Sequence, residues 1–291
     1  MRRIVLSILC IVLALTVSAK RSVKSVPLTE EERQRFLYYF YEALHQHQQE
    51  HYGNAYMLMQ FCNQINPNDA IVHQYIGDII YANHRLEEAL SYYERSYALD
   101  KQNTPVLYRL EQVYIDLKQF DLAIDTRHEI DRRNGYNTYS ATRRFQIYAL
   151  ANDSKNALRT VEDYLRYDPY NADFLIYRVQ LYEMSRVSFK KLQAAYESAL
   201  EVIPSEPTLL NNYAYALATH KGDLKRAEQM SGMAIRQDPN NPTFLDTYAW
   251  ILYLKGEKTL AQFYIKKAIY YIGNQAIPKE IQDHYKLIYA P

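Results

Sequence analysis

Apolar residues, six of them alanine, return along the chain at an almost constant spacing. They are Ala55, Ala89, Ala123, Ala157, Leu192, Ala227 and Ala261, separated by 34, 34, 34, 35, 35 and 34 residues. Twelve residues after each stands a second marker, in most cases a helix breaker: Pro67, Lys101, Gly135, Pro169, Pro204, Pro239 and Gly273. Two markers that keep one period indicate an internal repeat, and an internal repeat decides the fold before any other feature.

The 34-residue unit resembles the tetratricopeptide repeat (TPR), most clearly in "LLNNYAYALATHKGDLKRAEQMSGMAIRQDPNN" and "FLDTYAWILYLKGEKTLAQFYIKKAIYYIG". In the second of these, Tyr248-Ala249 matches the first helix, Gly256 the turn, and Ala261 and Ala268 the second helix. The resemblance implies an all-α, right-handed α-solenoid of about seven TPR helix hairpins plus a C-terminal capping helix. Each hairpin is too small to bury its apolar faces alone, so neighbours must stack to complete a core.

The third to fifth units fit the family pattern less well, because Arg127 and Arg144 occupy places where it prefers apolar residues. The two 35-residue intervals are explained by one extra residue in the turn between the helices of a hairpin, at 183–190 and again at 218–221. In the first helix, Thr29 followed by Glu32 predicts a capping box. Near the end of the chain, Ile281, Tyr285 and Ile288 form one apolar stripe, which predicts a single amphipathic helix.

These patterns divide the chain into a signal peptide at 1–19, a linker at 20–27, the TPR array at 28–274 and a capping helix at 275–291. The signal peptide is predicted from Met1-Arg2-Arg3, an apolar run from Ile4 to Val17, and a Val-x-Ala cut point ending at Ala19. An uncleaved anchor and a lipoprotein modified at Cys10 are the alternatives. We therefore expect an exported protein, periplasmic or associated with an outer membrane. Only Cys62 remains after cleavage, and we expect it to be a small core residue rather than a reactive thiol.

Composition and motifs exclude several functions. Removing residues 1–19 leaves 34 − 2 = 32 basic residues against 33 acidic ones, and the basic pairs are scattered among acids, so no nucleic-acid partner is expected. The chain has neither a glycine-rich phosphate loop nor a G-x-S-x-G nucleophile elbow. We expect no cofactor and no catalysis.

One motif favours an alternative, a zinc metallopeptidase. His47-Gln-Gln-Glu50-His51 spells H-x-x-E-H, the signature of the inverzincin peptidases. Such a site needs both histidines one turn apart on one continuous helix. Alignment on Ala55 instead places residues 48–52 in the turn of the first hairpin. The repeat therefore favours a turn that happens to be rich in His and Gln.

The resemblance also implies where binding occurs, because the first helix of each TPR unit lines the concave groove. The groove positions selected as candidate binding residues are Phe40, Tyr81, Tyr108, Tyr139, Tyr182, Asn211, Tyr215, Asp246, Trp250 and Tyr253. No groove position is Lys or Arg, so the basic clamp by which some TPR proteins hold an acidic C-terminal tail is absent. Tyrosine offers contact area with a polar tip, which suits a groove for an extended peptide or a helix. The alternative is that many of the 30 tyrosines are core residues.

The sequence thus predicts a non-catalytic scaffold or adaptor of the bacterial cell envelope, which binds segments of other proteins in the TPR groove. The partner is expected to be a protein, within an envelope or outer-membrane complex. A further alternative is that tyrosine-rich faces join copies of the chain into a homo-oligomer.

Overall fold

A computed structural model describes residues 27–290, and the part of the chain that it describes consists of fifteen α-helices without a strand. The helices are α2 (Glu30–Gln48), α3 (Tyr52–Ile65), α4 (Ala70–Ala82), α5 (Leu86–Leu99), α6 (Thr104–Asp116), α7 (Phe120–Asn134), α8 (Thr138–Leu150), α9 (Ser154–Tyr167), α10 (Ala172–Met184), α11 (Phe189–Val202), α12 (Pro207–Thr219), α13 (Leu224–Gln237), α14 (Pro242–Leu254), α15 (Lys258–Ile272) and α16 (Lys279–Tyr289). The predicted signal peptide at 1–19, and all but the last residue of the predicted linker at 20–27, lie outside the described residues. No helix between residues 27 and 290 combines the length and the apolar character needed to cross a bilayer.

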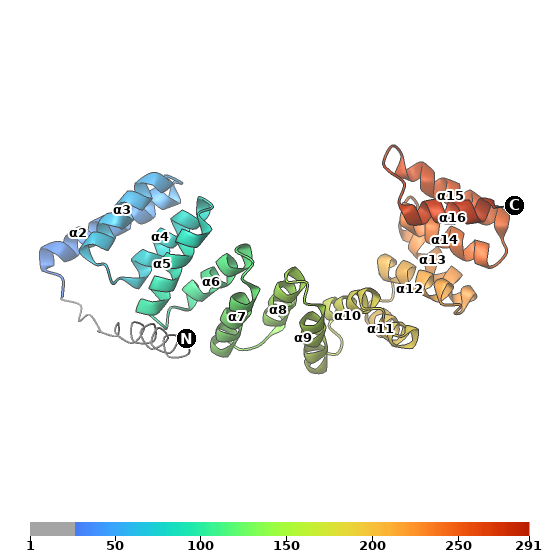
Figure 1. Ribbon diagram of the computed structural model, residues 1–291, viewed down its shortest axis with the longest axis horizontal. Coiled ribbons are helices and arrows are strands. Elements are labelled where there is room, and N and C mark those ends of the chain that lie inside the picture. The colour runs from blue at the N-terminus through green and yellow to red at the C-terminus, as the bar shows by residue number, and fades with distance from the viewer. Residues whose placement is uncertain (1–26, 291) are drawn as a thin grey trace, which may run out of the picture. The chain divides into compact units, whose positions relative to one another are not determined.

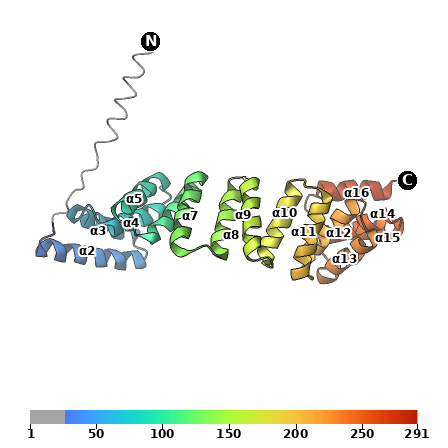
Figure 2. The ribbon, with the colours of Figure 1, turned by 90° about the horizontal axis from the view of Figure 1, so that it is seen from below.

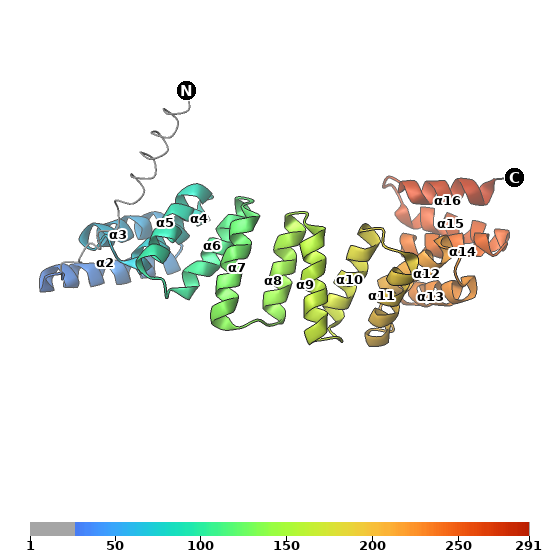
Figure 3. The same ribbon diagram turned by 60° about the horizontal axis from the view of Figure 1, so that its bottom comes forward.

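The helices pair into seven antiparallel hairpins, and α16 follows them as a single helix (Figure 1). The chain divides between Gly135 and Tyr136 into two compact units. In the first unit the hairpins are α2/α3, α4/α5 and α6/α7; in the second they are α8/α9, α10/α11, α12/α13 and α14/α15. Figures 2 and 3 show the paired helices of each hairpin side by side. The predicted all-α array of hairpins is confirmed.

Every hairpin turns through one residue with a left-handed backbone. These residues are Glu50, His84, Lys118, Asn152, Arg186, Lys221 and Gly256, with φ between 49° and 85°. Their spacing of 34 or 35 residues repeats the period of the sequence in the backbone itself. Only the last is a glycine, although this conformation costs other residues about 1 kcal/mol or more. The turn shape is therefore imposed by the packing of the helices on either side of it.

The two longer repeats differ from the others just after this turn residue. Five hairpins join their helices through three residues, whereas the α10/α11 turn spans residues 185–188 and the α12/α13 turn spans 220–223. The extra residue follows Arg186 and Lys221 and precedes the second helix. Both insertions lie in the turns where they were predicted; the first is inside the predicted range 183–190, whereas the second follows Lys221 and so lies just beyond the predicted range 218–221.

Small residues are buried between the two helices of the hairpins. The repeated alanines Ala55, Ala89, Ala123, Ala157, Ala227 and Ala261 are all fully buried. In the second hairpin, Gly77 of α4 faces the ring of Tyr93 of α5, and a Cβ atom on Gly77 would lie 2.6 Å from the Cε1 atom of that ring. Cys62 is likewise fully buried, and burial raises the pKa of its thiol to about 12. The prediction of a core cysteine is confirmed.

Buried tyrosines explain much of the aromatic content. Their hydroxyl groups donate hydrogen bonds to carboxylates of the preceding helix: Tyr93 to Asp78, Tyr114 to Glu94, Tyr182 to Glu162, Tyr196 to Glu183, and Tyr213 to Glu197. Burial is the main cause that raises the pKa of the Tyr114 and Tyr182 phenols to about 12, and the neighbouring carboxylate adds to it. At neutral pH these phenols therefore stay protonated and act as donors.

Arg127 is a buried cation in the second helix of the third hairpin. Its side chain is 1% exposed and pairs with Glu111 of α6 and, at 3.7 Å, with Asp131 of α7. A charge in such a place is tolerated only with close partners of opposite sign. This pairing accounts for an arginine where the family pattern asks for an apolar residue. The other exception, Arg144 of α8, lies 4.8 Å from the ring centre of Tyr136.

The last helix covers the final hairpin. Ile281 and Ile288 of α16 are buried in one apolar cluster with Ala249, Leu252, Ala261 and Ile265 of α14 and α15. Tyr285 is half-buried beside them. The apolar stripe predicted for this helix therefore packs as expected, and it hides the otherwise open face of the last repeat. At the other end of the array, Thr29 and Glu32 form the predicted capping box.

The contact between Gly77 and Tyr93 leads to a stability prediction. Changing Gly77 to Ala should lower the free energy of unfolding by about 1–3 kcal/mol, because the new Cβ overlaps a ring that is held by Asp78. Urea unfolding followed by circular dichroism measures the change. Gly53→Ala in α3 is the control: nothing lies within 4 Å of its would-be Cβ, so the same substitution should raise stability by about 0.5 kcal/mol. Equal effects at both positions would contradict the proposed close contact.

Candidate binding cleft

A cleft of about 340 Å³ opens in the second unit, among the first helices of its hairpins and the start of α16. It is lined by Glu183, Leu192, Asn211, Asn212, Tyr215, Ala216, Thr219, His220, Thr243, Asp246, Thr247 and Glu280. We call it the α12–α14 cleft, because these two neighbouring first helices supply most of its wall. Three of the residues selected from the sequence, Asn211, Tyr215 and Asp246, meet in it.

Asp246 lies at the end of a buried network that fastens α16 to the cleft. Both of its carboxylate oxygens lie 3.0 Å from Nδ1 of His284. The imidazole ring in turn stacks on Trp250, with ring centres 4.4 Å apart and planes inclined by 12°. Trp250 stacks on Tyr253, with a centre distance of 5.4 Å. The network therefore joins three sequence-predicted residues of α14 to one histidine of the capping helix.

Burial and neighbouring charges perturb the acids and phenols of the cleft. Burial raises the pKa of Asp246, the nearby Glu280 adds to this effect, and the hydrogen bond and charge of His284 oppose it. Burial also raises the pKa of Tyr215 well above its usual value, and the neighbouring Glu280 carboxylate adds to this effect. The Tyr215 phenol is therefore protonated at neutral pH and can act as a hydrogen-bond donor in the cleft.

Asn211 is the most deeply buried polar residue of the cleft, with 1% of its surface exposed. Its Nδ2 atom donates to Oδ1 of Asn212 over 3.4 Å. Its own Oδ1 atom has no hydrogen-bond partner among the described residues. A buried amide oxygen without a partner costs free energy, and a bound ligand is one way to satisfy it.

Two important residues of this site, Glu280 and His284, were not selected from the sequence. Both come from α16, which the sequence presents only as a cover for the last repeat. The available signal was the position of His284, three residues after Ile281 and four before Ile288, on the buried stripe. Its pairing with Asp246, 38 residues earlier, depends on how α16 docks and cannot be deduced from the repeat pattern.

In the first unit, the selected residues are occupied by contacts within the fold. Phe40 packs between Phe36 and Tyr75, with ring centres 5.9 Å away in each case. The Tyr81 hydroxyl donates to Asp116 at 2.5 Å. The Tyr108 hydroxyl accepts a 2.7 Å hydrogen bond from Asn134. The three side chains belong to separate contacts and line no common cleft among those described above.

The remaining selected residues of the second unit differ widely in exposure. Tyr139 is 60% exposed, whereas Tyr182 is only 5% exposed. Because the Tyr182 hydroxyl is bonded to Glu162 at 2.6 Å, its position is that of a packing residue rather than a groove contact. Trp250 and Tyr253 are half-buried and pack against α16. Removing both would therefore disturb the capping helix as well as any bound partner.

The H-x-x-E-H motif is divided by the turn of the first hairpin, as the repeat predicts. His47 is in the last turn of α2, Glu50 has the left-handed turn backbone, and His51 occupies the N-cap position of α3 without a capping hydrogen bond from its side chain. The His47 ring packs on Tyr52, and Nδ1 of His51 lies 3.1 Å from Oε1 of Gln46. The two histidines thus do not share a helix. Within residues 27–290, no group of three or more metal-ligating side chains is placed to hold an ion.

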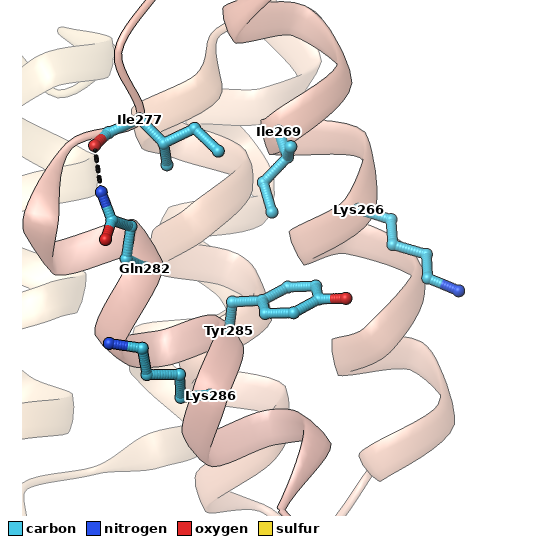
Figure 4. A pocket seen from close by; sticks show the side chains of 6 residues that line it. All are labelled: Lys266, Ile269, Ile277, Gln282, Tyr285 and Lys286. Carbon is cyan, nitrogen blue, oxygen red and sulfur yellow. Dashed lines mark hydrogen bonds between the residues drawn. The ribbon is translucent and has the colours of Figure 1, made fainter.

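A second cleft, of about 490 Å³, lies between α15 and α16 and has a different character. Figure 4 shows the Tyr285 ring extending from α16 toward α15, below Ile269 and Ile277, while Lys266 and Lys286 extend away from it. Gln282 closes one side by donating a 2.8 Å hydrogen bond to the Ile277 carbonyl. None of the selected residues lines it, and its only charged lining groups are these two lysines.

Known proteins with the same architecture support this description. No family model matches the chain. A TPR repeat-containing protein of Methanocaldococcus jannaschii is 23% identical over 235 residues, which are 74% of this chain and 40% of that protein. This chain thus spans less than half the length of that relative. Among solved structures, the C-terminal part of a TPR repeat-containing protein from Cytophaga hutchinsonii matches with a TM-score of 0.62 and 15% identity, covering 84% of this chain and 98% of that one. A tetratricopeptide repeat protein from Parabacteroides merdae matches with a TM-score of 0.48 and 16% identity, covering 88% and 99%.

The helix order and the solved structure from Cytophaga define an all-α repeat protein built of helical hairpins. The 34-residue period, the repeated turn and the named relative specify the class further. In its fold and its repeat the chain is similar to tetratricopeptide-repeat proteins.

The raised pKa of Asp246 leads to a pH prediction. Between the unfolded and folded pKa values the folded chain binds more protons than the unfolded chain, so wild-type stability falls as pH rises through that window, from about pH 4 upward. The Asp246→Asn variant has no carboxyl group at this position, so it does not lose stability in this pH window for that reason. The stability of the variant relative to wild type should therefore increase with pH, as measured by urea unfolding between pH 3.5 and 7. A relative stability that falls over this range would show that His284 outweighs burial.

Proposed function

We propose that this TPR array is a non-catalytic scaffold that holds a segment of a partner protein in the α12–α14 cleft. One observation carries the proposal. Asn211, Tyr215 and Asp246, each selected as a groove position from the repeat alone, line a single open cleft. Concave sites with a few fixed polar groups are the usual places for a ligand.

The arrangement of these groups fits recognition better than chemistry. The Asp246–His284 pair has the composition of a catalytic dyad, but His284 is 6% exposed and is not among the lining residues. Its ring is sandwiched into the packing of α16 by Trp250. The pair therefore fixes the wall of the cleft, and the polar groups left at its surface are amides, hydroxyls, carboxylates and the imidazole of His220.

The cleft is also built on rigid elements. Its wall comes from the regular helices α12 and α14, whose inner faces are buried in the core of the second unit. Side chains held on packed helices lose little conformational freedom when a partner binds, and this favours affinity. Thr219 and Thr243 are exposed at the edge, where a segment longer than the cleft would continue.

A crosslinking experiment tests the site of binding. A photoreactive amino acid placed at Thr243, at the edge of the cleft, should yield a covalent adduct with a partner protein when the full chain is irradiated in its native cells. The matched control carries the same residue at Tyr270 of α15, which is 77% exposed and lies outside the cleft. Adducts are measured by immunoblot and identified by mass spectrometry.

The proposal requires adducts at Thr243 in clear excess over those at Tyr270. Equal yields, or a stronger signal at Tyr270, would contradict it. An adduct that contains only this chain would show that the groove joins copies of the protein, which is the homo-oligomer alternative.

We also propose, from residues 1–19 alone, that this scaffold works in the cell envelope after export. The charged start, short apolar run and small residues before Lys20 support cleavage after Ala19. The intact mass of the protein purified from its native cells should then correspond to residues 20–291. Retention of residues 1–19 would favour the membrane-anchor alternative, and a lipid mass on Cys10 the lipoprotein alternative.

A further inference from the structure

The α12–α14 cleft carries acidic groups from three different helices. Glu183 belongs to α10, Asp246 to α14 and Glu280 to α16, and no Lys or Arg is among the lining residues. In the second cleft, between α15 and α16, the charged lining residues are both lysines. The acidic character is thus a property of this cleft and not of the second unit as a whole.

Each of the two exposed carboxylates has a tyrosine as a neighbour. The Tyr196 hydroxyl donates to Oε1 of Glu183, and Tyr215 lines the cleft together with Glu280. Burial raises the pKa of both phenols, and the neighbouring carboxylate adds to this effect, so each phenol keeps its proton at neutral pH. An ionised carboxylate has about four lone-pair sites, so one tyrosine partner leaves most of its capacity available. The carboxylates of Glu183 and Glu280 can therefore accept further hydrogen bonds from a ligand.

The unpartnered oxygen of Asn211 is an independent sign of a ligand in this place. The residue is 1% exposed, lines the cleft, and has its Nδ2 atom engaged with Asn212. The carbonyl oxygen that remains is an acceptor only. The cleft thus combines carboxylates at its rim with a buried, unpartnered amide oxygen in its wall, and its natural complement is a cationic group rich in N–H donors.

We infer that the α12–α14 cleft binds a basic side chain of the partner segment, the guanidinium of an arginine or the ammonium of a lysine, between Glu183, Glu280 and Asn211. This inference rests on the proposed function, because it names the chemistry of the segment that the scaffold holds. A guanidinium has five donors in a planar fork and stacks on aromatic rings, whereas an ammonium has three donors. Tyr215 supplies an aromatic ring in the same wall. Arginine is therefore the better complement of the two.

Short peptides test the inference with the full-length protein. The probes are acetylated and amidated Ala-Ala-X-Ala-Ala, where X is arginine, lysine or citrulline, and binding is measured by ligand-observed NMR titration. Citrulline keeps the shape and most donors of arginine but has no charge. The arginine peptide should bind at least about ten-fold more tightly than the citrulline peptide, since charged hydrogen bonds are roughly twice as strong as neutral ones. The lysine peptide should fall between them, and a lysine peptide that binds most tightly would assign the site to an ammonium.

Protein variants then locate the binding site. Glu183→Gln combined with Glu280→Gln should weaken the arginine peptide by about ten-fold or more, and Asn211→Ala should weaken it by a smaller factor. The control, Glu201→Gln with Asp283→Asn, removes the same charge from two exposed carboxylates outside the cleft and should leave binding unchanged. Circular dichroism verifies that each variant is folded, and the citrulline comparison in wild type does not depend on any substitution.

Two results would overturn the inference: equal binding of the arginine and citrulline peptides, or unchanged arginine binding in the Glu183/Glu280 double variant. Failure of the proposed function is a separate outcome. If Thr243 forms partner adducts but wild type does not prefer the basic peptides, the scaffold role stands and the basic side chain is wrong. If Thr243 forms no adducts, the scaffold role itself fails.

Discussion

The whole array depends on how closely the two helices of one hairpin can approach. Six hairpins place an alanine at the contact, and the second hairpin adds Gly77 against the Tyr93 ring. Small residues here bring the backbones together, so that the larger apolar side chains on either side interdigitate with the next hairpin. Each repeat packs against a neighbour to bury its apolar faces. A substitution that disturbs the packing within one hairpin therefore also disturbs the apolar core that this hairpin shares with the next. Gly77, which in an isolated helix would be a weakness, is thus a requirement of this packing.

Tyrosine connects this packing to the recognition surface. The ring of a buried tyrosine packs in the apolar core, and its hydroxyl donates a hydrogen bond to a carboxylate of the preceding helix, as Tyr182 does to Glu162. Where the carboxylate lines the cleft, as Glu183 does, the same kind of bond, here from Tyr196, holds the acid at the rim. The residues that stabilise the stack therefore also determine where negative charge stands in the cleft. The same kind of tyrosine–carboxylate pair thus occurs in the core, at Tyr182, and beside the proposed binding cleft, at Tyr196.

The repeat period was sufficient to predict the fold, since a spacing of 34 residues specifies hairpins, turns and stacking together. It also located both lengthened turns and the divided H-x-x-E-H motif, because each depends only on register within a unit. Register could not decide the role of each tyrosine: Tyr182 and Tyr215 occupy groove positions of successive hairpins, yet one is buried and the other lines the cleft. Nor could it find Glu280 and His284, which reach the cleft only because α16 docks across the last hairpin. These residues are brought to the cleft by tertiary contacts that do not follow the 34-residue repeat.

The turns at 185–188 and 220–223 lie at the edge of the same cleft, since Glu183 precedes the first and His220 begins the second. Each absorbs one added residue after its left-handed position, while Leu192 and Ala227 keep their places in the core. Lengthening a surface loop costs little free energy, about 0.6 kcal/mol for a doubling of its length. Insertions in these two turns could therefore change the rim of the cleft, and with it the specificity, while the packing of the helices stays the same.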